Sequence, residues 1–323
     1  MPFNIDHLKI DCAEEADRIG EAMRLFLRET RRKGVVLGLS GGIDSSVTAA
    51  LAVRALGAER VFGIFMPETD SEAESLTLGR LLAGGLGIRS TVEDISPALT
   101  GLKCYERRND AVTGVIPSFT PEWKFKIVLP GAGHQGFNFY SVVARSPDGV
   151  EVKVRLPLDA YLAIVAATNF KQRVRKTVEY YWADRLNYIV AGTPNRLEFD
   201  QGFFVKQGDG ASDMKPIAHL YKTQVYEMGA YLGIPMEIQR RLPTTDTYSL
   251  PQGQDEFYFS LPYGKLDLCL YGKNHGISME EIATATGLSL TQVEYTCKDI
   301  DAKRSTTRYQ HLVPRLLEEV IRA

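Results

Sequence analysis

The chain has 323 residues, enough for one large α/β domain or one with an appended piece, and its 44% of hydrophobic and 24% of charged residues are usual for a globular protein. Its net charge of −2 gives no reason to expect general nucleic-acid binding. The four cysteines form no CxxC pair, which argues against a zinc ribbon or a disulfide framework. The acidic N-terminal region is unlike a signal peptide, and the longest apolar stretches are too short to span a bilayer. We therefore expect a cytoplasmic enzyme with no nucleic-acid or membrane partner.

Predicted helices and strands alternate over much of the chain. Residues 11–33 carry apolar side chains at spacings of four and three, which predicts an amphipathic packing helix. Further elements are predicted from apolar runs and their flanks: strands at 34–39, 61–66, 90–95 and 187–191, and helices at 47–56 and 71–86. This alternation predicts a doubly wound, mostly parallel sheet flanked by helices. Ligands bind such sheets at the carboxyl ends of the strands.

The segment 40–46, SGGIDSS, lies between the first predicted strand and the next helix. Backbone N–H groups at a helix start lack internal partners and carry the positive end of the helix dipole, so they attract anions. Gly41 and Gly42 let a phosphate approach the backbone closely. Asp44 would repel a bare phosphate, which indicates a bridging cation such as Mg²⁺. We expect a nucleotide site here, the alternative being an ordinary Gly-Ser turn with Asp at a helix cap.

Residues 102–160 interrupt the alternation, since they show little helical periodicity and are rich in Gly, Pro and aromatic residues. Residues 139–143 and 150–156 alternate like strands, and Asp148-Gly149 between them is a hairpin signal. We expect a β-rich insertion over the active edge of the sheet. It could act as a lid, a specificity element or a dimer contact.

The C-terminal segment, residues 265–323, is predicted to be helical. Within it, residues 277–300 resemble a helix-turn-helix around Gly287. The second of its helices, expected at 291–301, carries more acidic than basic side chains, whereas a helix that reads DNA needs a positive surface. Packing of a helical hairpin is therefore the favoured interpretation.

Polar motifs follow the SGGIDSS loop along the chain: NFKQR (169–173), GTPNRLE (192–198), KQGDGASD (206–213), KT (222–223), PTTD (243–246) and QDE (254–256). The loop resembles the SGGxDS signature of the PP-loop ATP pyrophosphatases, and the order of these motifs resembles the NAD synthetase family of PP-loop amide ligases. The resemblance covers about residues 34–304 without the insertion. It implies an adenine nucleotide alpha-hydrolase-like fold, a single domain over residues 1–323 and a homodimer.

The resemblance implies a two-step reaction. The nicotinate carboxylate of deamido-NAD attacks the α-phosphate of ATP and releases pyrophosphate, and ammonia then converts the acyl-adenylate into the carboxamide of NAD. A glutaminase domain would need a few hundred more residues with a Cys nucleophile. Free ammonia, or ammonia from a separate amidase subunit, is therefore implied.

The resemblance also implies roles for individual residues. Asp44 and Lys222 would be catalytic, and Asp44 and Glu198 would bind Mg²⁺. The expected contacts to ATP are Ser40, Gly41, Gly42, Asp44, Ser45, Ser46, Thr193, Lys222 and Thr244. The expected contacts to deamido-NAD are Arg173, Lys206, Asp213 and Lys303.

Some residues depart from the family pattern. Ala302 stands where a His is usual, the residues after Glu256 differ from the usual run, and the insertion is longer than in simple family members. These differences leave open an amide ligase that adenylates another carboxylate. A non-catalytic nucleotide sensor or DNA-binding regulator is a third hypothesis, against which the intact Asp44, Glu198 and Lys222 argue.

Overall fold

The main sheet of the protein is parallel and has four strands. The computed structural model describes residues 2–128, 140–244, 247–253, 258–259 and 261–318. The strand order is β3-β2-β1-β7, with Val35 of β1 level with Val61 of β2 and Ile189 of β7. The strands are β1 (Val35–Gly38), β2 (Val61–Phe65), β3 (Arg89–Val92) and β7 (Ile189–Val190).

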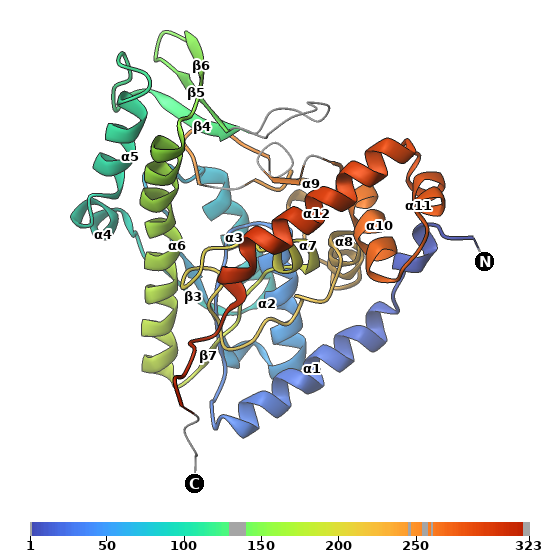
Figure 1. The fold of residues 1–323 in the computed structure, drawn as a ribbon. Helices are drawn as coiled ribbons and strands as arrows, with labels where there is room; N and C mark the ends of the chain where they lie inside the picture. Colours follow the sequence, from blue (N-terminus) through green and yellow to red (C-terminus); the bar gives the residue numbers. More distant parts are fainter. Residues whose placement is uncertain (1, 129–139, 245–246, 254–257, 260, 319–323) are drawn as a thin grey trace.

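Helices cover both faces of this sheet, as the doubly wound prediction requires (Figure 1). On one face, α1 (Cys12–Glu29) and α2 (Ile43–Leu56) bury apolar side chains in a core that includes Val35 and Leu37. On the other face, the long helix α6 (Leu158–Leu186) packs against Val36 and its neighbours. Alternating side chains of β1 therefore enter opposite cores, which explains its uninterrupted apolar sequence.

Shorter helices complete the molecule. Within the described ranges, no helix is both long and apolar enough to cross a membrane. The remaining helices before the C-terminal region are η1 (Ile5–Leu8), η2 (Ala58–Arg60), α3 (Ala73–Leu86), α4 (Ser96–Gly101), α7 (Arg196–Gln201), α8 (Lys222–Tyr231) and α9 (Met236–Arg240).

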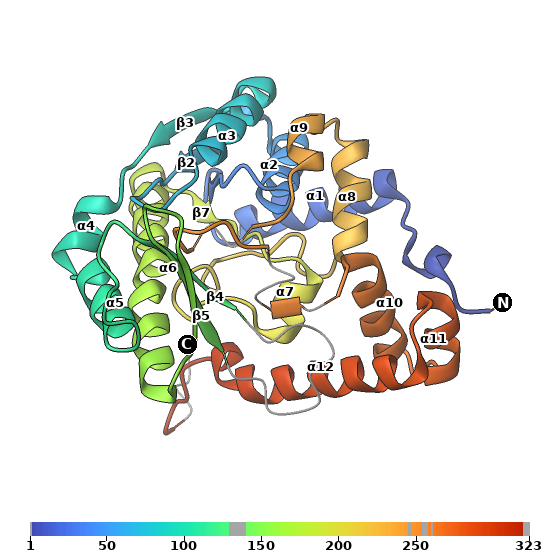
Figure 2. The ribbon, with the colours of Figure 1, turned by 90° about the horizontal axis from the view of Figure 1, so that it is seen from above.

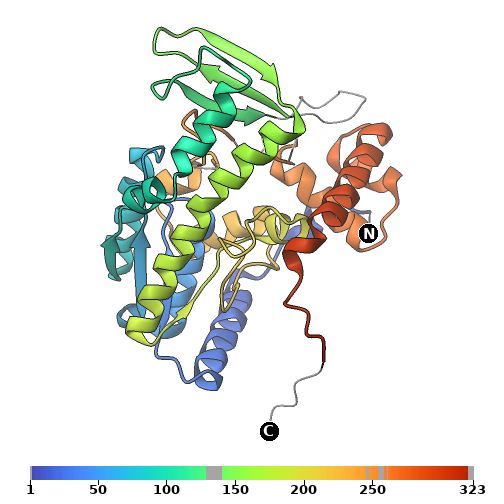
Figure 3. The same cartoon turned by 60° about the vertical axis from the view of Figure 1, so that its left-hand side comes forward.

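The predicted insertion contains a small antiparallel sheet, made of β4 (Lys124–Val128), β5 (Ser141–Arg145) and β6 (Glu151–Arg155). Figure 3 shows this sheet at one end of α6, away from the main sheet. The hairpin predicted at Asp148-Gly149 joins β5 to β6, and Gly149 adopts a positive φ of 86°. The expectation of little helix was wrong for α5 (Cys104–Thr113), which packs along α6 and is polar on its outer side. Residue 139, the start of one predicted strand, lies outside the described residues.

The C-terminal region is helical only in part. It contains α10 (Tyr263–Asn274), α11 (Met279–Thr286) and α12 (Leu290–His311), which lie along one side of the molecule (Figure 2). The chain then continues to residue 318 without a helix, so the predicted helical end was wrong there, and residues 319–323 lie outside the described part. The helical-hairpin interpretation is confirmed, because Ile282 of α11 and Val293 of α12 pack into one core with α10.

Candidate active site

The loop after β1 leads directly into α2, which begins at Ile43 and not at residue 47 as predicted. Gly42 is the N-cap and its helix has no side-chain cap, so the first backbone N–H groups keep their capacity to bind an anion. Gly41 has a φ of 71°, and a Cβ atom there would lie 2.5 Å from the carbonyl oxygen of Ser75. Gly41 is therefore needed for the shape of the loop, whereas a Cβ atom at Gly42 would meet only Ser40 Oγ, at 3.3 Å.

Because α2 begins earlier than predicted, Ser45 and Ser46 lie in its first turn. Ser46 is fully buried, and its Oγ donates to the Gly42 carbonyl at 2.8 Å. Ser45 Oγ donates to the same carbonyl at 3.0 Å and lies 3.2 Å from Ser40 Oγ. Ser40 and Ser45 line the cavity described below, whereas Ser46 stabilises the loop from behind.

Asp44 is the centre of a polar cluster at the start of α2. Its Oδ2 forms a close ion pair with Lys222 Nζ, and its Oδ1 accepts from Asn195 Nδ2 at 3.0 Å. Lys222 is fully buried, which opposes its charged form, but the carboxylates of Asp44 and Glu198 outweigh this and raise the pKa of Lys222. The lysine therefore remains a cation beside the anion-binding loop.

Two further carboxylates hold this cluster together. Glu198 and Asn195 cap α7 reciprocally: each side chain accepts from the other residue's backbone N–H at 3.2 Å. Asp267 accepts from the backbone N–H of Lys222 at 3.3 Å and of Thr223 at 2.8 Å, at the start of α8. Burial raises the pKa of Asp267 to about 6.

A cavity of about 890 Å³ opens at the carboxyl ends of β1, β2 and β7, where the parallel sheet was predicted to bind its ligand. A cavity of this volume is large enough for a nucleotide. Ten predicted site residues line it: Ser40, Gly42, Asp44, Ser45, Arg173, Thr193, Glu198, Lys206, Thr244 and Lys303.

Four predicted residues do not line the cavity. Gly41 is the loop residue that packs against the Ser75 carbonyl, and Ser46 is buried beneath the loop. Lys222 does not line the cavity itself but pairs with Asp44, which does. The carboxylate of Asp213 accepts from the backbone N–H of Val190 at 2.7 Å and from the Tyr180 hydroxyl at 3.2 Å. It therefore holds β7 in place, which favours a supporting role over a direct ligand contact.

Three cations that line the cavity come from parts of the chain other than the loop at residues 40–46. Lys206 Nζ donates to the backbone carbonyls of Tyr309 and Leu312, at 2.9 and 3.0 Å. Arg173 Nε donates to the carbonyl of Lys206 at 3.3 Å. Lys303 Nζ pairs with Asp299 at 2.6 Å, and burial lowers the pKa of Lys303. Ala302, where the resemblance leads one to expect a His, also lines the cavity.

Arg241 has no predicted role, yet it contacts the phosphate loop directly. Its guanidinium donates to the Ser40 carbonyl at 3.3 Å, to Ser75 Oγ at 2.8 Å and to Glu72 at 2.9 Å. The guanidinium offsets the charge of Glu72 next to the anion-binding loop. Arg241 stands two residues before the motif at Pro243-Thr244, and this nearness could have indicated that it lies at the site.

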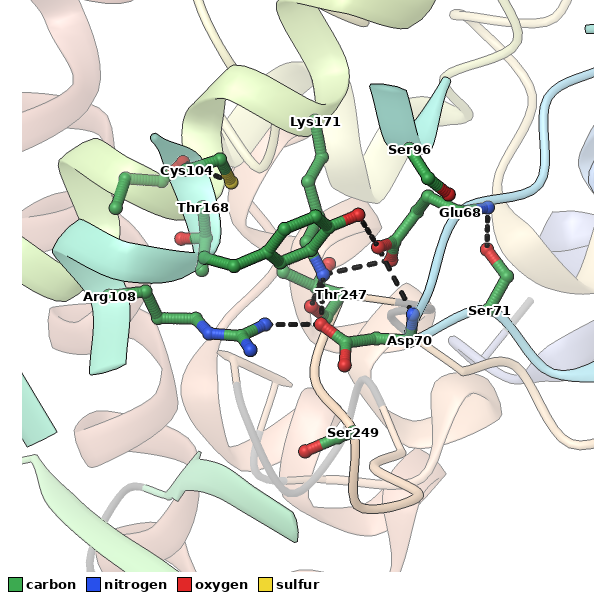
Figure 4. A network of polar contacts seen from close by, with 12 residues as sticks. Glu68, Asp70, Ser71, Ser96, Cys104, Arg108, Thr168, Lys171, Thr247 and Ser249 are labelled. Carbon is green, nitrogen blue, oxygen red and sulfur yellow. Dashed lines mark hydrogen bonds and ion pairs between the residues drawn. The ribbon is translucent and has the colours of Figure 1, made fainter. Parts of the chain in front are cut away.

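A second set of residues without a predicted role surrounds the buried Lys171 (Figure 4). Lys171 lies within the motif NFKQR, yet only Arg173 of that motif was expected at the site. Its partners Glu68 and Asp70 lie 103 and 101 residues before it in the chain. Arg108, which pairs with Asp70, comes from a third segment, so no local pattern marks the cluster.

Comparison with known proteins places these observations in a family. A profile described as NAD synthase matches residues 15–114 and 156–310, and so omits most of the insertion. The NH(3)-dependent NAD(+) synthetase of Rhizobium meliloti strain 1021 is 58% identical over 321 residues, which cover 99% of this chain and 96% of the relative. The enzyme of the same name from Rhizobium rhizogenes strain K84 is 56% identical over 98% of this chain and 96% of the relative.

Solved structures agree on the fold. The NMN synthetase from Francisella tularensis superposes with a TM-score of 0.66 at 22% identity, covering 95% of this chain and 99% of that one. The NH3-dependent NAD synthetase from Campylobacter jejuni gives a TM-score of 0.63 at 21% identity, covering 96% and 100%. At these identities the likeness concerns the fold alone.

Proposed function

This chain belongs to the NAD synthase family, and on that premise we propose that it makes NAD from deamido-NAD, ATP and ammonia. The observation that carries the proposal is the meeting of the α2 N-terminus, Asp44, Glu198 and buried Lys222 at one cavity. The identity of 58% to a named NAD synthetase, over nearly the whole chain, favours deamido-NAD over another carboxylate.

The reaction has two bond exchanges. A nicotinate carboxylate oxygen bonds to the α-phosphorus of ATP, and the bond from that phosphorus to the bridging oxygen breaks, so that pyrophosphate leaves. Ammonia then attacks the acyl carbon, AMP leaves with the bonding electron pair, and a proton is lost. No covalent enzyme nucleophile is needed, so catalysis depends on positioning and on stabilising charge at the phosphate oxygens.

The residues at the loop end suit the ATP half of this reaction. The N–H groups of α2 and the hydroxyls of Ser40 and Ser45 would bind phosphate oxygens, with Thr193 and Thr244 as further contacts. Lys222 would offset the negative charge that develops on the α-phosphate, held in place by Asp44.

Mg²⁺ fits the carboxylates of this site. In the described part of the chain, no group of three His, Cys, Asp or Glu side chains could hold a metal by itself. Mg²⁺ is commonly bound by one or two carboxylates together with substrate phosphates. Asp44 and Glu198 line the same cavity and would hold the ion, which would neutralise phosphate charge when bound.

The opposite end of the cavity suits the acceptor. Arg173, Lys206 and Lys303 present positive charge that a dinucleotide with a free carboxylate would need. We further propose that residues 1–323 act as one catalytic domain within a homodimer in the cytoplasm. The ammonia would be free or delivered by a separate amidase.

The test is pyrophosphate release from Mg-ATP and ammonium, measured with and without deamido-NAD. We expect release that requires deamido-NAD and falls about 1,000-fold in Asp44→Asn, because the variant loses charge at both the metal and Lys222. NAD formation is measured in the same samples. Pyrophosphate release that does not depend on deamido-NAD would instead indicate an amide ligase for a different carboxylate. No pyrophosphate release under any condition would favour a nucleotide sensor without catalysis.

A further inference from the structure

The buried amine of Lys171 binds acceptors from two separate loops. This residue of α6 is fully buried, and its Nζ lies 2.8 Å from Glu68 Oε1 and 2.7 Å from Asp70 Oδ2. Its third partner is the backbone carbonyl of Thr247, at 2.7 Å. All three N–H groups of the ammonium are therefore used, one for each acceptor (Figure 4).

Helix α5 supplies the rest of the network. Arg108 forms a close ion pair with Asp70, and the Tyr105 hydroxyl donates to Glu68 Oε2 at 2.8 Å. Burial raises the pKa of Tyr105 to about 12, so its hydroxyl remains a donor at neutral pH. Burial opposes ionisation of Asp70, yet the charges of Lys171 and Arg108 prevail and lower the pKa of its carboxyl. Two carboxylates thus face two cations, and the cluster is balanced in charge.

The first loop in this network forms a wall of the cavity. Four of its residues line the cavity, namely Met66, Pro67, Ser71 and Glu72. Glu68 and Asp70 lie between these two pairs in the sequence, and their carboxylates bind Lys171, which does not line the cavity. Glu68 Oε2 also accepts from the backbone N–H of Asp70 at 3.1 Å, so the ion pair and the turn support each other.

The second loop forms another wall and is attached to the insertion. Thr247 and Tyr248 line the cavity. Just beyond them, the backbone N–H of Leu250 donates to the Phe125 carbonyl of β4 at 3.1 Å, and the N–H of Phe125 donates to Ser249 Oγ at 2.9 Å. The segment after Thr247 is thus bonded to the insertion's sheet.

We propose that Lys171 is a positioning residue through which the insertion holds both walls of the cavity in the arrangement that binds ATP. The insertion then acts as a support for the nucleotide site. This proposal rests on the proposed function in one respect, since it takes Mg-ATP as the ligand of the cavity.

The test compares Lys171→Met and Arg108→Gln with the wild-type chain. Mg-ATP binding is measured by calorimetry without an acceptor, and hydrogen exchange is measured over residues 66–72. The control is Lys273→Met, which removes a lysine that pairs with Asp301 at 2.8 Å between α10 and α12, outside the cavity lining. A thermal unfolding curve for each variant identifies those that fold.

We expect Lys171→Met to raise the Kd for Mg-ATP about tenfold and to accelerate exchange over residues 66–72. Arg108→Gln keeps the lysine contacts and should raise the Kd about threefold. Lys273→Met should lower the unfolding temperature without changing either readout. Affinity and exchange within twofold of wild type in the folded variants would overturn the proposal, and Arg108→Gln alone decides it if Lys171→Met does not fold.

The same experiment separates this proposal from the proposed function. Wild-type protein that binds no Mg-ATP would contradict the proposed function. The exchange rates of residues 66–72 would still decide whether Lys171 orders that wall of the cavity.

Discussion

Two groups of cavity residues are built by different means: the loop end, made by the phosphate loop with Asp44 and Lys222, and the proposed acceptor end, made by Arg173, Lys206 and Lys303. At the loop end, the polar side chains follow the strands of the parallel sheet and pair with one another, as Asp44 does with Lys222. At the acceptor end, Lys206 and Arg173 are held mainly by backbone carbonyls of neighbouring segments. A ligand carboxylate or phosphate can replace such carbonyls at these cations, whereas the loop end is assembled before any ligand arrives.

At the loop end, a large loss of rate is expected when the charge of the buried Lys222 is removed. We expect Lys222→Met to reduce the rate of pyrophosphate release in a single turnover about 100- to 1,000-fold, because a preorganised cation next to the phosphates is lost. The binding of deamido-NAD should change little. A folded variant that keeps a tenth or more of the wild-type rate would contradict the role of Lys222, and Lys9→Met, which breaks an exposed pair with Asp6, is the control.

At the acceptor end, the expected effect is on binding. Lys206→Met should raise the KM for deamido-NAD about 10- to 50-fold, the usual worth of a charge-assisted hydrogen bond, while the KM for ATP stays within twofold. Steady-state kinetics with each substrate varied in turn measure both constants. An equal rise in the KM for ATP would show that the two ends do not act separately.

The smallest expected effect concerns stability and pH at the loop end. Burial raises the pKa of Asp267 from 3.8 to about 6, so the folded chain binds more protons than the unfolded chain between these values. The stability that this carboxyl provides is therefore greatest below pH 4 and decreases as the pH rises to about 6. Urea unfolding at several pH values should show this decrease in the wild type and a flatter profile in Asp267→Asn. Identical pH profiles for the wild type and Asp267→Asn would contradict the raised pKa of Asp267.

The phosphate loop could be predicted because its signals are local. An apolar strand, two glycines and a following helix specify an anion site within about ten residues, and the structure confirms the strand, the turn and the helix. The start of α2 was placed too late, at residue 47 instead of Ile43. The hydroxyl of Ser46, which the resemblance implies as an ATP contact, donates to the Gly42 carbonyl.

Other features could not be predicted, because they depend on residues that are distant in the chain. A lysine within a helix is usually solvated, and nothing near Lys171 indicates that Glu68 and Thr247 will surround it. Helix α5 was missed because its sequence is largely polar and gains its stability by packing on α6.

The burial of Lys171 and Lys222 also divides the amines of the protein into two chemical groups. A reagent that acylates amines can reach Lys9, whose side chain is 69% exposed, in the native state. It can reach the amines of Lys171 and Lys222, which are fully buried, only after the surrounding structure opens. Acylation of these two lysines, followed over time by mass spectrometry, would therefore serve as a clock for opening of the nucleotide site.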